Sequence, residues 1–132
     1  MSVLTTQTPA AADAWTAVCP SALLAAERGT AALLPGGEQA AVFRTAAGEL
    51  YAVSNIDPFT GAAVIARGIT GDRAGEPTVA SPLLKHVFSL RTGLPLDGEG
   101  PGLATYPVRE RDGQVEVGTA DGTADGTGGG RL

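Results

Sequence analysis

Glycine and proline are spread through nearly the whole chain, and this feature restricts the possible folds more than any other. The 132 residues include 19 glycines and nine prolines. Glycine destabilises a helix interior, and proline lacks the amide hydrogen that a helix interior needs. Long helices are therefore excluded, and short strands joined by tight turns are expected. With 43% apolar residues the chain can bury one small core, so we expect a single domain.

Several apolar and β-branched runs between turn sequences are predicted to be strands. The clearest turn is Asp112-Gly113, a dipeptide typical of two-residue hairpins. A short helical turn is expected over 22–26, ending at Gly29. Residues 55–77 contain many Gly and Pro pairs and are expected to form two loops around the apolar run 62–66. The expected strands cover residues 15–19, 30–34, 39–45, 49–54, 78–81, 87–91, 105–111 and 114–117.

The two ends of the chain differ in composition from the middle. Residues 1–14 are rich in Thr, Ala and Gln without periodicity, and residues 118–132 repeat Gly-Thr-Ala-Asp before a glycine run. We interpret them as a flexible N-terminal arm and a disordered, low-complexity tail, which leaves 15–117 as the domain. The first residues lack the features of a signal peptide, and no segment reaches the roughly 20 apolar residues of a membrane span. A cytoplasmic protein is expected.

The supply of charged and metal-binding side chains argues against several classes of function. The net charge is −5 and no run of Lys or Arg occurs, which argues against nucleic-acid binding. Cys19 is the only cysteine and His86 the only histidine, so the chain can form neither an internal disulfide nor a four-cysteine metal site. Cys19 is interpreted as a small core residue. Without paired carboxylates or a nucleophile beside a base, catalysis by this chain alone is not expected.

Three segments occur in the motif order of a known domain. Residues 51–59 read Tyr-Ala-Val-Ser-Asn-Ile-Asp-Pro-Phe, residues 79–93 read Val-Ala-Ser-Pro-Leu-Leu-Lys-His-Val-Phe-Ser-Leu-Arg-Thr-Gly, and residues 103–108 read Leu-Ala-Thr-Tyr-Pro-Val. This order resembles a Rieske domain, in which Asn-Ile precedes Cys-x-His and a second loop carries Cys-x-x-His before Phe-x-x-x-Thr-Gly. The resemblance implies a mostly β fold, a Rieske-like β sandwich of short antiparallel strands with two loop tips and little helix.

The metal-binding positions of that family carry other residues here. A Rieske cluster is held by two thiolates and two imidazoles. On the family frame the first motif falls on Asp57 and Phe59, and the second falls on Ser81 and Leu84. None of the four is a cysteine or a histidine. The resemblance therefore implies vacated cluster-ligand positions and no metal or other cofactor bound by this chain.

A narrower resemblance covers about three quarters of the chain. The stretches at 54–59, 67–69, 71–72, 75–77 and 80–83 look like the small subunit of assimilatory NAD(P)H-dependent nitrite reductases. This resemblance implies a non-catalytic subunit that supports a large subunit, which would carry FAD, siroheme and an iron–sulfur cluster and reduce nitrite to ammonium. The alternative is a stand-alone Rieske-like protein-binding or regulatory module with no redox role.

The two loop tips contain the candidate binding residues. Apolar groups there either fill the place of the cluster or contact a partner, and the sequence leaves both options open. Asp57 is interpreted as a turn former because Asp before Pro commonly starts a turn. The isolated cations Arg67, Lys85 and Arg91 are more typical of solvated surface than of an anion site, and a metal site at the lone His86 is not expected. The predicted partner-binding residues are Pro58, Phe59, Pro82, Leu83 and Lys85.

Overall fold

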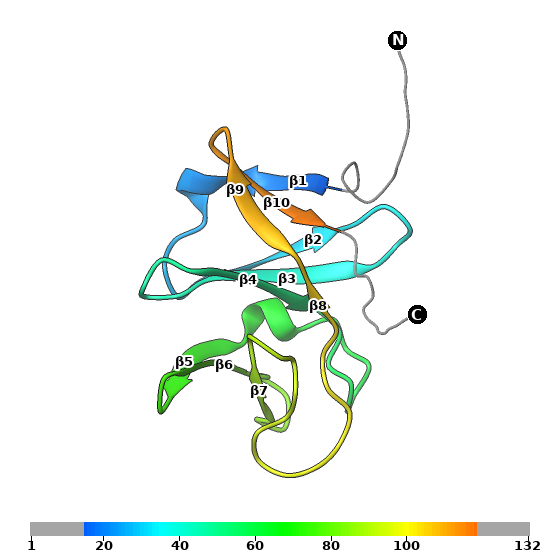
Figure 1. Cartoon of the computed structure of the whole chain (residues 1–132). Coiled ribbons are helices and arrows are strands. Elements are labelled where there is room, and N and C mark those ends of the chain that lie inside the picture. Colours follow the sequence, from blue (N-terminus) through cyan, green and yellow to red (C-terminus); the bar gives the residue numbers. More distant parts are fainter. Residues whose placement is uncertain (1–14, 119–132) are drawn as a thin grey trace.

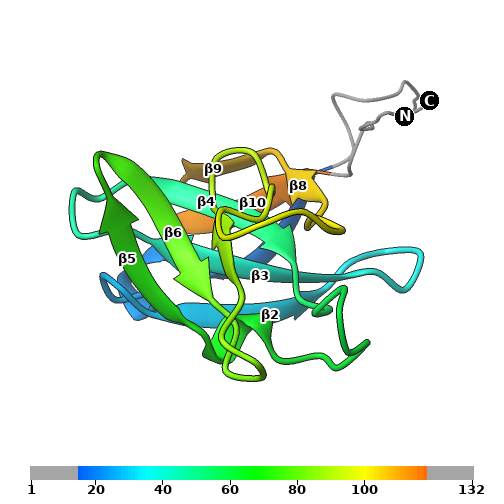
Figure 2. The same ribbon diagram turned by 90° about the horizontal axis from the view of Figure 1, so that it is seen from below.

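Three small antiparallel sheets lie one above the other in the computed structural model, which describes residues 15–118 (Figure 1). The first sheet has the order β1-β10-β9, the second β2-β3-β4-β8 and the third β5-β6-β7. Seen from below, the third sheet crosses the strands of the second (Figure 2). The mostly β architecture of short antiparallel strands expected from the sequence is confirmed. The strands are β1 (Trp15–Pro20), β2 (Gly29–Leu33), β3 (Gln39–Arg44), β4 (Leu50–Ser54), β5 (Ile69–Arg73), β6 (Glu76–Ala80), β7 (Val87–Ser89), β8 (Thr105–Tyr106), β9 (Val108–Arg111) and β10 (Gln114–Gly118).

Strand β3 explains why the fold has two cores. Its residues 40–43 are all buried, and successive side chains of a strand point to opposite faces of the sheet. Ala40 and Val42 therefore pack toward the first sheet, in a cluster with Val115 and Val117. Ala41 and Phe43 pack toward the third sheet, in a cluster that includes Val79, Phe88 and Leu90. The second sheet is thus covered on both faces.

The predicted final hairpin and the predicted meander are both present. Strands β9 and β10 pair around Asp112-Gly113, where both residues have positive φ angles of 54° and 79°, as this turn type requires. The meander from β2 to β4 is also present, because β3 pairs with both neighbours in antiparallel register. These turns are local features, which explains why the sequence predicted them correctly.

Two predicted elements differ in the structure, one because packing overrides local preference and the other because a proline interrupts the strand. The helical turn expected over 22–26 is a 3-10 turn at Ser21–Leu23, and Leu24 is already extended with φ −96° and ψ 94°. Leu24 is buried in the first core, and its carbonyl accepts a hydrogen bond from Arg44 Nε at 2.9 Å. The single strand expected over 105–111 is divided into β8 and β9 by Pro107, which has no amide hydrogen to donate to a ladder.

The middle of the chain is more regular than predicted. Residues 55–77, expected to form loops, contain a second 3-10 turn at Ile65–Arg67 and the strand β5, which pairs with β6 over its whole length. The connecting turn is Ala74-Gly75, where both φ angles are positive. Because an alanine with a positive φ is uncommon, this turn gave no sequence signal, and the prediction of two loops was wrong there.

The N-terminal arm and the C-terminal tail predicted from composition lie outside residues 15–118, apart from Gly118 at the end of β10. Among the described residues no helix is long and apolar enough to cross a membrane.

Candidate functional site

The four positions that the Rieske frame assigns to metal ligands lie on two loops, which we call loop 1 (residues 55–64, between β4 and Ile65–Arg67) and loop 2 (residues 81–86, between β6 and β7). Loop 1 is a closed turn held by its own backbone. The Asp57 N–H donates to the Ala62 carbonyl at 2.8 Å, and the Gly61 N–H donates back to the Asp57 carbonyl at 2.7 Å. The Asp57 side chain accepts the Phe59 N–H at 2.8 Å, which is the turn-forming role predicted for it.

Loop 2 is closed at its base and strained at its tip. The Ser81 N–H donates to the His86 carbonyl at 2.8 Å, and the Ser81 hydroxyl accepts the Leu83 N–H at 3.2 Å. Leu84 and Lys85 both have left-handed backbones, with φ angles of 61° and 60°. Non-glycine residues in this conformation persist where the surrounding contacts over-determine the loop, and such strain clusters at binding sites.

A buried hydrogen bond joins the two loops at their bases. The Ser81 hydroxyl donates to Asp57 Oδ2 at 2.5 Å, across 24 residues of sequence. Both side chains are completely buried. The two positions that the Rieske frame assigns to cysteine thus lie in direct contact, and each satisfies a polar group of the other.

An aromatic stack joins the loops further out. The rings of Phe59 and His86 are almost parallel, with centroids 3.8 Å apart and an interplanar angle of 13°. The Phe88 ring lies behind them, 6.2 Å from Phe59. A Cβ atom added to Gly100 would lie 2.7 Å from Phe59 Cζ, so a third segment also approaches this ring closely. The Phe59 ring is therefore packed against His86, Phe88 and the backbone at Gly100.

The same loops expose apolar surface. Phe59 is 36% exposed, Leu83 38% and Leu84 70%. Of the predicted partner-binding residues, Pro82 and Lys85 are also exposed and Pro58 is half-buried. Phe59 fits both options that the sequence left open, because its ring packs against loop 2 while part of its surface remains exposed. We call the exposed surface formed by Phe59, Pro82, Leu83, Leu84 and Lys85 the loop-tip surface.

The residues at these positions do not fit an iron–sulfur cluster. Asp57 and Ser81 are bonded to each other, and Phe59 and Leu84 offer no donor atom. Cys19 lies on β1 in the first sheet, and burial raises the pKa of its thiol, which disfavours the thiolate that binds metals. Within residues 15–118 no group of three or more His, Cys, Asp or Glu side chains is arranged to hold a metal ion.

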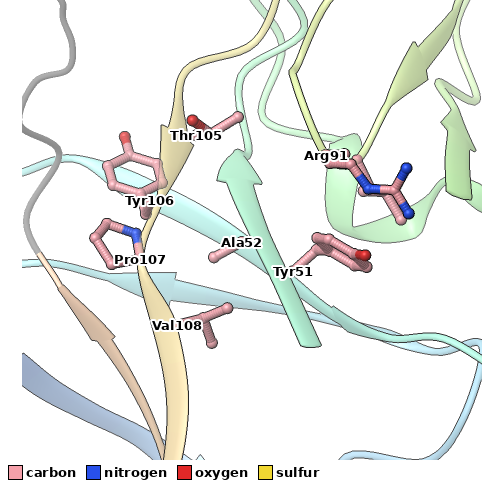
Figure 3. Close-up of a pocket in the computed structure, with 8 residues that line it drawn as sticks. Tyr51, Ala52, Arg91, Thr105, Tyr106, Pro107 and Val108 are labelled. Carbon is pink, nitrogen blue, oxygen red and sulfur yellow. The ribbon is translucent and has the colours of Figure 1, made fainter. Parts of the chain in front are cut away.

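A separate groove of about 350 Å³ follows the β4–β8 pair (Figure 3). Arg91 lies beside Tyr51 at one side of it, and Pro107 and Val108 lie on the other side. A hydrogen bond with Tyr51 raises the pKa of Arg91 further, so the guanidinium is always charged. The predicted surface cation therefore borders a groove. The lining of the groove contains no histidine or carboxylate that could activate its hydroxyl groups, and we assign the groove no function.

Sequence reasoning missed both contacts between the loops. No sequence pattern indicated that the His86 ring stacks on Phe59. The hydrogen bond between Asp57 and Ser81 joins residues far apart in the chain, and no local pattern announces it. The one available signal was the family frame, which placed both residues at the cluster.

Comparisons with known proteins identify the family. The family model of the Rieske-like [2Fe-2S] domain matches residues 14–118. The small subunit of nitrite reductase (NADH) from Escherichia coli strain K12 is 39% identical over 104 residues, which cover 78% of this chain and 95% of that protein. A crystal structure of a Mycobacterium tuberculosis protein, proposed to be an NADH-dependent nitrite reductase small subunit, is 43% identical with a TM-score of 0.77 and covers 80% of this chain and 95% of that one.

A third relative is a longer protein. The large subunit of nitrite reductase, NAD(P)H type, from Klebsiella oxytoca is 38% identical over 104 residues, which cover 79% of this chain and 11% of that protein. Both resemblances seen in the sequence, the wider one to Rieske domains and the narrower one to nitrite reductase small subunits, are confirmed by these matches. The chain belongs to the Rieske-like [2Fe-2S] domain family and, within it, to the small subunits of NAD(P)H-dependent nitrite reductases.

Proposed function

We propose that this chain is the small subunit of an NAD(P)H-dependent nitrite reductase, which reduces nitrite to ammonium in nitrate and nitrite assimilation. The observation that carries the proposal is the match to the Escherichia coli small subunit over 95% of that protein. The chain supplies no catalytic group of its own in this proposal. It supports a large subunit that holds FAD, siroheme and an iron–sulfur cluster, and it works in the cytoplasm.

The Klebsiella oxytoca relative supports a direct contact with the large subunit. In that protein a segment resembling this chain makes up 11% of a chain named as the large subunit. Covalent joining gives the segment a high effective concentration beside the rest of its own chain. The same domain as a separate chain needs a binding surface to reach the same place.

The loop-tip surface is our proposed binding surface. Its three large apolar side chains lie together on two loops that are fixed to each other, and clustered exposed apolar groups commonly mark protein interfaces. Lys85 adds one cation at its edge, which suits a partner with a carboxylate facing it. An apolar contact with a charged rim is the usual anatomy of a protein–protein interface.

The first experiment compares the candidate large subunit expressed with and without this chain. We expect the two chains to co-purify, and NAD(P)H-dependent nitrite reduction to depend on this chain. A large subunit that is fully active alone and does not bind this chain would reject the proposal and favour the stand-alone binding module. Purified small subunit should contain no iron after dialysis; stoichiometric iron would contradict the cofactor-free reading.

The binding surface can be tested with two matched substitutions. Leu84→Asp changes the loop-tip surface, and Leu33→Asp changes an equally exposed leucine on β2, since both side chains are 70% exposed. We expect Leu84→Asp to raise the dissociation constant at least tenfold and Leu33→Asp to change it less than twofold. Equal effects of the two variants would move the interface elsewhere.

Lys85 offers an independent test because it is the only lysine in the sequence. A zero-length carbodiimide cross-linker joins an amine to a carboxylate in contact with it. Cross-linked peptides containing Lys85 and a large-subunit carboxylate are expected in the complex. If Lys85 reacts with an amine reagent equally fast in the complex and in the free chain, it lies outside the interface.

A further inference from the structure

We propose that the hydrogen bond between Asp57 and Ser81 is the cross-link that makes the two loop tips one rigid binding surface. Asp57 and Ser81 are then positioning residues: neither touches the partner, and both hold the residues that do. The proposal rests on the proposed function, because it explains how the loop-tip surface is kept in a binding-competent shape.

The position of the bond supports this role. In a Rieske centre the loop cysteines bind iron, so the metal joins the two loops. Here the same two positions hold Asp57 and Ser81, whose oxygens are 2.5 Å apart and completely buried. A hydrogen bond has thus replaced the metal as the link at the base of the loops.

The bond also connects to both loop tips. Asp57 Oδ1 accepts the Phe59 N–H at 2.8 Å, and the Ser81 hydroxyl accepts the Leu83 N–H at 3.2 Å. One continuous chain of hydrogen bonds therefore runs from the backbone of Phe59 to the backbone of Leu83. Phe59 contributes the apolar side chain of loop 1 to the loop-tip surface, and Leu83 contributes one of those of loop 2.

Loss of the bond should loosen both loops together. Without the Ser81 hydroxyl, Oδ2 of the buried Asp57 has lost its partner, and a buried acceptor without a partner favours a conformation that reaches water. Rotation of Asp57 toward water would release the Phe59 N–H as well. The Phe59–His86 stack would then lose its support from loop 1, although His86 itself is unchanged.

The test uses one variant and one matched control. Ser81→Ala removes the cross-link. Ser89→Ala removes another completely buried serine hydroxyl, which donates to the Glu76 carboxylate. Ser89 is the last residue of β7 and lies outside both loops. In binding to the large subunit, we expect Ser81→Ala to raise the dissociation constant at least tenfold and Ser89→Ala to change it less than twofold.

A conservative variant separates positioning from folding. Asp57→Asn keeps an oxygen for the Phe59 N–H and can donate to the Ser81 oxygen, so it should bind more tightly than Asp57→Ala. If Ser81→Ala does not fold, this pair of Asp57 variants decides. Wild-type affinity in folded Ser81→Ala, or equal affinities of Asp57→Asn and Asp57→Ala, would overturn the proposal while leaving the proposed function standing.

Amide hydrogen exchange tests the cross-link without any partner. In free Ser81→Ala we expect exchange of the Phe59 and Gly61 amides to be at least tenfold faster than in the wild type, although the substitution is in the other loop. Ser89→Ala should leave these two rates unchanged. Unchanged loop 1 exchange in Ser81→Ala would overturn the cross-link, whether or not the wild type binds the large subunit.

Discussion

Gly93→Ala is predicted to be far more destabilising than Gly113→Ala, although the two glycines have nearly the same φ angle. Their φ angles are 80° and 79°. A Cβ atom at Gly93 would lie 2.0 Å from the Leu103 carbonyl oxygen, whereas a Cβ atom at Gly113 has nothing within 4 Å. The comparison therefore isolates the close approach of two backbones from the cost of the left-handed conformation.

The magnitudes follow from these contacts. A left-handed alanine costs roughly 1–2 kcal/mol at either position. At Gly93 the new methyl group must also displace the Leu103 carbonyl and disturb two hydrogen bonds, from the Gly93 N–H to Ser89 at 2.8 Å and from the Leu103 N–H to Gly93 at 2.7 Å. Overpacking costs roughly 1–3 kcal/mol and each hydrogen bond about 1 kcal/mol. Gly93→Ala should therefore be about 3–5 kcal/mol less stable than Gly113→Ala.

Urea unfolding at neutral pH measures the difference directly. The slope of the free energy of unfolding against urea concentration should be the same for the wild type and both variants, so that differences in midpoint convert to differences in free energy of unfolding. Similar losses of stability in the two variants would refute the reasoning, because such a result would mean that the backbones at Gly93 and Leu103 can move apart at little cost. The predicted gap corresponds to a difference in melting temperature of more than about 10 °C for a domain of this size.

Three further outcomes are expected. Burial raises the pKa of Tyr106 to about 12. The fold therefore favours the neutral phenol, whose contribution to stability is complete below pH ~10 and is lost as the pH rises through the raised pKa. Over that range, urea midpoints should show that the wild type loses on the order of 2 kcal/mol more of its free energy of unfolding than Tyr106→Phe does. Burial also raises the pKa of the Cys19 thiol, so iodoacetamide should react more slowly with folded than with unfolded protein at pH 8; equal rates would contradict this. The hydrogen bond from Arg73 lowers the pKa of Asp97, and because the pair is exposed, Asp97→Asn should cost little stability at neutral pH and nothing once acid protonates the wild-type carboxyl.

The elements that the sequence predicted well are those fixed by neighbours along the chain. The hairpin at Asp112-Gly113 and the strands from β2 to β4 depend on turn residues and alternation, which can be read locally. β5 was missed because the turn that pairs it with β6 places Ala74 in a left-handed conformation. β5 contributes no residue to the second core, and its position is fixed by its five-residue ladder with β6, whose Val79 packs in that core.

The site shows the same division between local and distant information. The turn role of Asp57 was predictable from the proline that follows it, and the structure shows the corresponding bond to the Phe59 N–H. The bond from Ser81 to the same carboxyl was not predictable, because it depends on how two loops meet above the second core. Only the family frame, which assigned both residues to one cluster, placed them near each other in advance.

The four positions that the Rieske frame assigns to cluster ligands carry two different kinds of residue, and the difference follows burial. The inner pair, Asp57 and Ser81, is completely buried and has become a mutually satisfied polar pair. The outer pair, Phe59 and Leu84, is 36% and 70% exposed and has become apolar. Loss of the ligands without a new role would leave the buried polar groups of the inner pair without partners. It would also favour polar residues at the outer pair, because exposed apolar surface is an association risk. Order inside and apolar surface outside are what our proposal requires, in which these loops bind a protein partner.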